Sequence, residues 1–308
     1  MSIAIWIGIA LVCFVMPAVA MTKGGKKAPG HDTLTRYAGQ TGLPLTEAVA
    51  GPVIERIRRR ERGMSIGGTA AIVLGGLASI LIDDSNDWGA LVLALAGAGT
   101  AFGGAWAMAA HRPEPTTDRP VVARLRSTEL SDYLTGGERF GLWAAPATVI
   151  AGVPAGVLLF QQLPAEIRGN SVTIGLIGAG IALVTWTVAL LVLRRVLTAP
   201  ARSGSDLELA WDDAERALGL RQLTNLAVAV AGIALAFWLI LMAQSLTTTG
   251  FYRQPGAMPL TYTLTLASLA VFGVLIAITA AGPVRAWLSG ERRGYEQRRL
   301  WPNGVTVR

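Results

Sequence analysis

The sequence predicts an all-α protein, a polytopic transmembrane helical bundle of about seven spans. The first observation is composition: of the 308 residues 52% are hydrophobic and 15% are charged, whereas soluble domains carry about 25% charged residues. The second is that the apolar residues gather into seven stretches, each close to the roughly 20 residues that a helical membrane span needs. A soluble fold would have to bury seven helices that are apolar on every side, which a chain of this length cannot easily do.

None of the seven stretches contains Asp, Glu, Lys, Arg or His, and they are Ser2–Ala20, Met64–Ile82, Trp88–Ala110, Phe140–Phe160, Val172–Leu193, Leu223–Ala243 and Tyr262–Ala281. We expect the first to be an uncleaved anchor. Its end resembles a signal-peptidase site, but no Lys or Arg precedes the apolar run. The other six form three similar hairpins, whose first spans begin near residues 64, 140 and 223.

These observations divide the chain into eight segments. They are an N-terminal transmembrane anchor (1–21), a cytoplasmic basic segment (22–63), transmembrane hairpin 1 (64–111), a cytoplasmic segment (112–139), transmembrane hairpin 2 (140–195), a cytoplasmic amphipathic helix (196–222), transmembrane hairpin 3 (223–284) and a cytoplasmic basic tail (285–308).

The distribution of Lys and Arg predicts the topology, because these residues concentrate in cytoplasmic loops. Of the 27 basic residues, all but Arg168 and Arg253 fall on alternate loops. The N-terminus is therefore expected outside and the C-terminus inside, in a multi-pass protein of the cell (plasma) membrane. The chain has 24 Arg against 3 Lys and is rich in Ala and Gly. These residues have GC-rich codons, which favours a GC-rich bacterial source.

A basic cluster stands directly before the second span and consists of Arg56, Arg58, Arg59, Arg60 and Arg62. We interpret this cluster first as the cytoplasmic flank of that span, because basic residues beside a span stay on the cytoplasmic side. Each arginine near the surface is also attracted to anionic lipid headgroups by about 1 kcal/mol, so contact with anionic membrane lipid is the alternative. We expect no nucleic-acid partner, because no nucleic-acid-binding module accompanies the cluster.

Residues 205–220 read as an amphipathic helix. Ser205 followed by Glu208 fits a capping box at its start. One face carries apolar side chains, at Leu207, Trp211, Ala214 and Leu218, and the other carries charges, at Asp212, Asp213, Glu215 and Arg216. We expect the charged face to be solvated.

Small residues recur at four-residue spacing within the spans, which lets helices approach closely and pack in lipid. The second span carries Gly67, Ala71, Gly75 and Ser79, and the third carries Gly97, Ala101 and Ala105. A further stripe in the fourth span consists of Ala144, Thr148, Gly152 and Gly156. The sequence predicts that these stripes are helix–helix contacts, within the bundle or with a protein partner.

No catalytic, cofactor-binding or metal-binding constellation is visible. His31 and His111 have no partner at metal-ligand spacing, and Cys13 is the only cysteine. The glycine-rich stretches lie in spans and match neither a dinucleotide-binding motif nor a phosphate loop. We therefore expect no cofactor, and the sequence leans away from an enzyme.

Three functions fit these observations, in order of preference. The first is a non-enzymatic integral membrane protein, an accessory, scaffold or assembly component of a membrane complex, whose cytoplasmic segments contact a protein partner. The second is a passive or facilitated permease for a neutral or lipid-like substrate, with the fourth span, kinked at Pro146 and Pro154, near the path. Coupling to an ion or proton is not expected, because the spans contain no ionisable residues. The third is a lipid-processing membrane enzyme that uses Glu129, Asp132 or the acidic helix at 206–215.

Overall fold

The computed structural model is helical, with no strand, over the residues that it describes, which are 38–39, 41–81, 96, 98–100, 102–107, 128–161, 165–199, 205–248 and 257–305. The principal helices are α4 (Glu47–Leu81), α6 (Leu130–Tyr133), α7 (Gly136–Gln161), α8 (Ala165–Thr198), α9 (Asp206–Thr248), α10 (Ala257–Leu288) and α11 (Tyr295–Leu300). The helical fold class predicted from the sequence is therefore confirmed for this part of the chain.

The chain divides into two compact units. The first unit comprises Met1–Thr135, Leu190–Leu226 and Ser289–Arg308, and the second comprises Gly136–Ala189 and Ala227–Leu288. Helices α8 and α9 each contribute residues to both units. The eight sequence segments remain predictions, and α9 runs without a break through the expected boundary at residues 222–223.

Four helical segments among the described residues are long and apolar enough to cross a membrane. They are Gly136–Leu158, Gly175–Thr198, Asp206–Ala236 and Thr265–Leu288. They overlap the last four predicted spans, which supports a membrane protein. Of the other three, Met64–Ile82 is helical as far as Leu81, Ser2–Ala20 lies outside the described residues, and Trp88–Ala110 lies there in large part.

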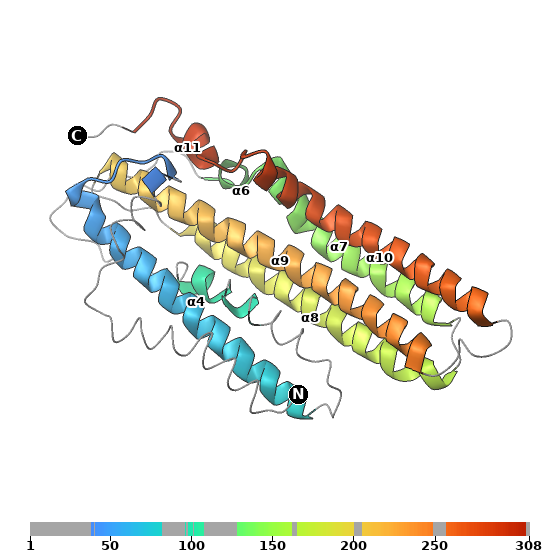
Figure 1. Cartoon of the computed structure of the whole chain (residues 1–308). Helices are drawn as coiled ribbons and strands as arrows, with labels where there is room; N and C mark the ends of the chain where they lie inside the picture. The colour runs from blue at the N-terminus through green and yellow to red at the C-terminus, as the bar shows by residue number, and fades with distance from the viewer. Residues whose placement is uncertain are drawn as a thin grey trace. The chain divides into compact units, whose positions relative to one another are not determined.

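The second unit is held together by small residues and one aromatic core. Helices α7 and α10 lie side by side (Figure 1), and they meet so closely that a Cβ atom on Gly137 would lie 2.6 Å from the carbonyl oxygen of Gly282. Leu235, Trp238 and Phe272 form the buried core of this unit.

The predicted small-residue stripe of the fourth span faces that core. Gly152 lies against Leu235 and Phe272, and Gly156 lies against the Trp238 ring. Ala144 and Thr148 are buried as well. The prediction that this stripe packs against other helices is confirmed.

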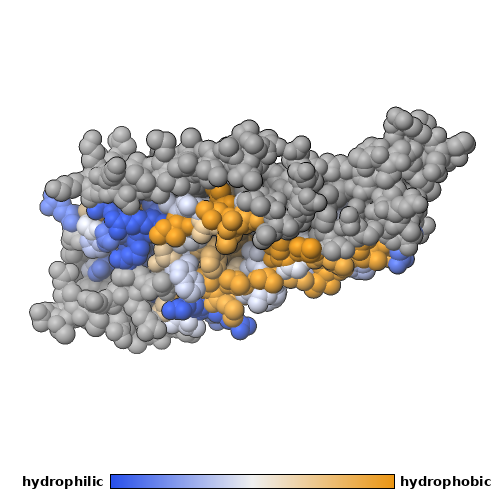
Figure 2. All heavy atoms as spheres, turned by 90° about the horizontal axis from the view of Figure 1, so that it is seen from below, coloured by the Kyte–Doolittle hydropathy of each residue, from blue (hydrophilic) through white to orange (hydrophobic). Residues whose placement is uncertain are grey.

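Many large apolar side chains of the second unit are exposed. Figure 2 shows orange hydrophobic side chains open on part of one face of the molecule. Exposed examples are Ile150, Leu158, Ile177, Val184, Leu266, Val274 and Ile278. Large exposed apolar patches on a protein mark contact with a membrane or with a partner. Lipid tails would accept these side chains at little cost, in agreement with the four spanning segments.

The first unit has its own apolar core, built from chain segments distant in sequence. Helix α9 supplies Leu207, Ala210, Trp211 and Ala214, and the preceding segment with α4 supplies Leu43, Val49, Val53 and Ile57. Trp301 and Val305, after α11, pack against the same cluster. The predicted apolar face of the 205–220 helix is thus confirmed by its burial at Leu207, Trp211 and Ala214.

Candidate functional site

The candidate site is the polar cluster of the first unit, where α6, the start of α9 and α11 meet. We call it the polar cluster and define it by Asp132, Tyr133, Asp213, Arg221 and Glu296. Four of these side chains are almost completely buried, and the Arg221 side chain is 12% exposed. Burying charge in this way is costly unless each group is paired and hydrogen-bonded.

The start of α9 places the first members of the cluster. The backbone N–H of Glu208 donates to Ser205 Oγ at 3.2 Å, so Ser205 caps the helix as the sequence predicted. Asp213 follows two turns later and is 1% exposed. The prediction that Asp213 belongs to a solvated face is therefore wrong, because α6 and the residues after α11 cover it.

Asp213 is held by two neutral donors. The Tyr133 hydroxyl donates to its Oδ1 at 3.1 Å, and the Trp301 indole N–H donates to its Oδ2 at 3.0 Å. Their distance in sequence, 80 and 88 residues, explains why no local motif revealed the contact. Two donors on one buried carboxylate meet the hydrogen-bonding needs of both of its oxygens.

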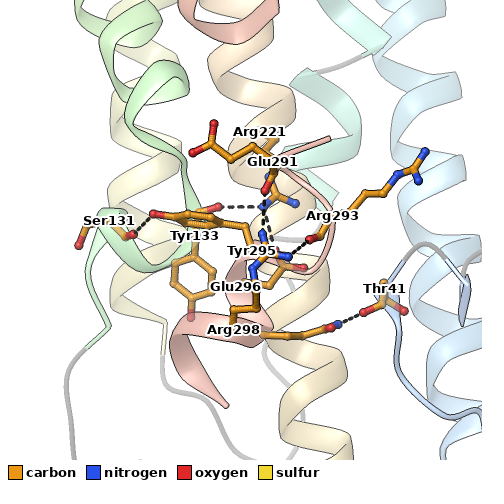
Figure 3. A network of polar contacts seen from close by, with 10 residues as sticks. Thr41, Ser131, Tyr133, Arg221, Glu291, Arg293, Tyr295, Glu296 and Arg298 are labelled. Carbon is orange, nitrogen blue, oxygen red and sulfur yellow. Dashed lines mark hydrogen bonds and ion pairs between the residues drawn. The ribbon is translucent and has the colours of Figure 1, made fainter. Parts of the chain in front are cut away.

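Arg221 supplies the cationic group of the cluster. Its Nη2 lies 2.8 Å from Glu296 Oε2 and also donates to the backbone carbonyl of Tyr133 at 3.1 Å. Figure 3 shows both contacts, with Tyr295 beside them donating from its hydroxyl to the Ser131 carbonyl at 3.1 Å. One arginine thus joins α6, α9 and α11.

The turn that brings α11 to this place depends on glycine. Gly290 and Gly294 have φ of 67° and 58°, in the left-handed region that side chains other than glycine rarely adopt. Arg298 then closes the turn by donating to the carbonyls of Arg293 and Glu291 at 2.7 and 3.1 Å (Figure 3). The Gln297 amide donates to the Thr41 carbonyl, which ties this tail to the segment before α4.

Asp132 has a local structural role. Its Oδ2 accepts a hydrogen bond at 3.0 Å from the backbone N–H of Glu129, which starts α6. Arg299 lies 3.6 Å from the other oxygen. Glu129 itself is exposed and accepts a bond from Ser131 at 3.3 Å. The carboxylates considered for an enzyme therefore cap and pair within this unit.

Arg56 belongs to the predicted basic cluster. It is a residue of α4, and its side chain reaches toward α9. Its guanidinium is 3.8 Å from Glu208 and 3.9 Å from Glu215. Asp212, also on the charged face of α9, pairs with Arg216 at 2.8 Å. The sequence did not predict that Arg56 would pair with the acidic helix.

The first two small-residue stripes lie partly within the described residues. A Cβ on Gly67 would overlap the carbonyl oxygen of Gly99, and Gly63 meets Gly103 in the same way. Ala71 lies against Gly99, and Gly75 and Ala105 are buried. Gly97, Ala101 and the side chain of Ser79 lie outside the described residues, as do Cys13, His31 and His111. The contact register at Gly63, Gly99 and Gly103 is one that sequence spacing alone did not select.

The polar cluster holds helices together through its buried, paired side chains. Within the described ranges, no group of three or more His, Cys, Asp or Glu side chains could hold a metal ion. Asp132, Asp213 and Glu296 are 2%, 1% and 3% exposed and each meets a donor or cation. Such groups hold helices in place and have little access to a substrate.

The Tyr133 hydroxyl should stay protonated well into the alkaline range, because burial, and then the Asp213 charge, raise its pKa above the ordinary value. Because the pKa of Tyr133 is higher in the folded than in the unfolded state, its hydroxyl contributes its full stabilisation of the fold below about pH 10. Above that pH the unfolded chain loses this proton more readily, so the free energy of unfolding falls as the pH rises. In an alkaline absorbance titration of the five tyrosines, we expect one late component that coincides with unfolding. Tyr133→Phe should remove that component, and Tyr262→Phe, at an exposed position, should leave it.

Comparisons of the chain with protein-family models, with curated proteins and with solved structures find no match.

Proposed function

We propose that this protein is a non-enzymatic integral membrane protein, an accessory, scaffold or assembly component of a membrane complex. Its first unit is the platform to which a protein partner binds. The observation that carries this proposal is the internal pairing of the buried carboxylates Asp132, Asp213 and Glu296. An enzyme needs an acid, base or nucleophile that can reach substrate, whereas these groups fix helices to one another.

The finer features of the proposal follow from the sequence. The chain crosses the plasma membrane of a bacterium about seven times, with its N-terminus outside and its C-terminus in the cytoplasm. The four apolar helical segments support the membrane location. On this topology the basic segment, the start of α9 and the tail after α10 are cytoplasmic, which places the polar cluster where a cytoplasmic partner could reach it.

The polar groups in the second unit favour the scaffold over the permease. Thr279 donates to Thr148 at 2.7 Å, and Thr148 donates to the carbonyl of Ala145 at 2.9 Å. Thr185 and Thr187 bond to carbonyls of their own helix at 2.8 and 2.9 Å. One hydroxyl pair joins α7 to α10, and the other hydroxyls bond within their own helix, so all four already have partners inside the helical bundle.

The test is to identify what the chain binds in its native membrane. A photo-crosslinking amino acid at Glu291, exposed in the first unit, should capture a protein during growth. The same probe at Leu158, 62% exposed on α7, is the matched control and should capture only lipid. Gentle detergent extraction, size-exclusion chromatography and mass spectrometry should then show the captured protein in stoichiometric amount.

A chain that elutes alone with bound lipid, and that crosslinks to no protein from Glu291, would contradict the scaffold proposal. Equal capture of the same protein from both positions would also contradict it, because the contact would then not be a property of the first unit.

A further inference from the structure

We propose that α4 carries a binding site for anionic phospholipid headgroups, formed by Arg58 and Arg62. The proposal rests on the membrane-spanning topology given above. The sequence suggested lipid contact for all five arginines of the cluster, and the structure separates them into two faces of one helix.

The inner face carries Arg56 and Arg60. Successive residues of an α-helix are turned by about 100°, so residues four apart lie about 40° apart on its surface. The Arg56 side chain is 17% exposed and faces Glu208 and Glu215 of α9. The Arg60 Nε atom is buried, and its side chain lies near Gly104. Arg56 thus joins α4 to α9, and Arg60 packs near Gly104 within the first unit.

The outer face carries Arg58 and Arg62, turned about 160° and 120° from Arg56 by the same helical geometry. Arg62 is exposed and Arg58 is partly exposed. Neither forms an ion pair or side-chain hydrogen bond with another described residue. Arg59 differs, because Glu55 lies 3.6 Å away and offsets its charge.

The outer face changes character one turn later. Ile66, Val73 and Leu77 are 70%, 52% and 53% exposed and lie within about 60° of Arg62 around the helix. Exposed charge followed by exposed apolar side chains on one face is the pattern expected where a helix passes from headgroups into lipid tails. Arg62 then lies at the level of the lipid phosphates.

The ligand follows from the chemistry of the two side chains. A guanidinium presents a planar set of donors that matches phosphate oxygens, and it is less strongly hydrated than an ammonium group. Its aliphatic stem can lie along the apolar surface while the charged end reaches the phosphates. A phospholipid with net negative charge, such as phosphatidylglycerol, offers a phosphate to the guanidinium and apolar tails to the aliphatic stem.

The test compares lipid retention by two matched double variants of the full chain. Purified protein in a zwitterionic detergent is mixed with equal amounts of phosphatidylglycerol and phosphatidylcholine, and bound lipid is measured by native mass spectrometry. The wild-type protein should prefer phosphatidylglycerol. Arg58→Gln/Arg62→Gln should lower that preference by roughly 30-fold, since each arginine contributes about fivefold.

The control Arg56→Gln/Arg60→Gln removes the same charge from the inner face. It should keep the lipid preference while unfolding at a lower temperature. A second control, Arg194→Gln/Arg293→Gln, neutralises two exposed arginines outside α4 and should keep both properties closer to wild type. It preserves the comparison if the inner variant fails to fold.

Undiminished preference in the outer variant would overturn the lipid site, and so would an equal loss in a folded control. Displacement of the lipid by inorganic phosphate would also overturn it, in favour of a site for a free anion. The measurement uses the isolated chain, so failure to find a protein partner, which contradicts the scaffold proposal, leaves its result unchanged.

Discussion

Glu296→Ala is expected to destabilise the first unit by about 3–5 kcal/mol, the usual cost of breaking a buried ion pair from one side. Glu296 is 3% exposed, and its carboxylate lies 2.8 Å from the largely buried guanidinium of Arg221. Removing the carboxylate leaves that guanidinium with the Tyr133 carbonyl and away from bulk water. The measurement is thermal unfolding of the purified protein in detergent, followed by loss of the folded size-exclusion peak.

Glu291→Ala is the matched control, because it removes an exposed carboxylate from the same tail. It should shift the unfolding temperature little, as for most surface substitutions. The double variant Arg221→Leu/Glu296→Leu should recover much of the lost stability, since apolar side chains of similar volume can replace a buried pair. Equal effects of Glu296→Ala and Glu291→Ala would show that the pair has no special role.

The helical class and the membrane character could be predicted from the sequence because both depend on local composition. A long apolar run without charge indicates by itself a helix in an apolar environment. The predicted span Phe140–Phe160 accordingly lies in α7. The cap at Ser205 was predictable for the same reason, since donor and acceptor are three residues apart. The buried face of the 205–220 helix followed from its periodicity.

The polar cluster could not be predicted, because the contacts of Tyr133, Asp213, Arg221 and Glu296 join residues that are 75 to 88 positions apart. Asp213 illustrates the difficulty. Beside Asp212 it resembles half of a solvated acidic face, and only the arrival of Tyr133 and Trp301 from other segments buries it. Nothing in the local pattern distinguishes the buried aspartate from its partly exposed neighbour.

The helix-packing stripes were predictable in kind but not in register. Spacing selected the Gly67 stripe and a second one through Gly97 and Ala101, whereas the closest contacts join Gly63 and Gly67 to Gly99 and Gly103. A glycine-rich helix offers several stripes of small residues, and the crossing angle of its neighbour decides which one is used. Sequence spacing contains no information on that angle.

Gly282→Val is expected to destabilise the second unit by about 3 kcal/mol, at the upper end of the range for overpacking. A Cβ atom at Gly282 would overlap the carbonyl oxygen of Gly137. Both positions are backbone at the contact of α7 with α10, so no flexible side chain can move aside. The helices would have to separate, and the nearby contact of Gly141 with Pro283 would open with them.

Gly273→Val on the same helix separates this clash from the general effect of replacing glycine. A Cβ atom there would have no heavy atom within 4 Å, and Gly273 is exposed. Both variants change helix propensity alike, so the difference in their unfolding temperatures measures the contact with Gly137. A fall for Gly282→Val of several degrees beyond that for Gly273→Val is expected. Equal unfolding temperatures would mean that α7 and α10 can separate at this point without cost, and that close glycine contact is not what holds the second unit together.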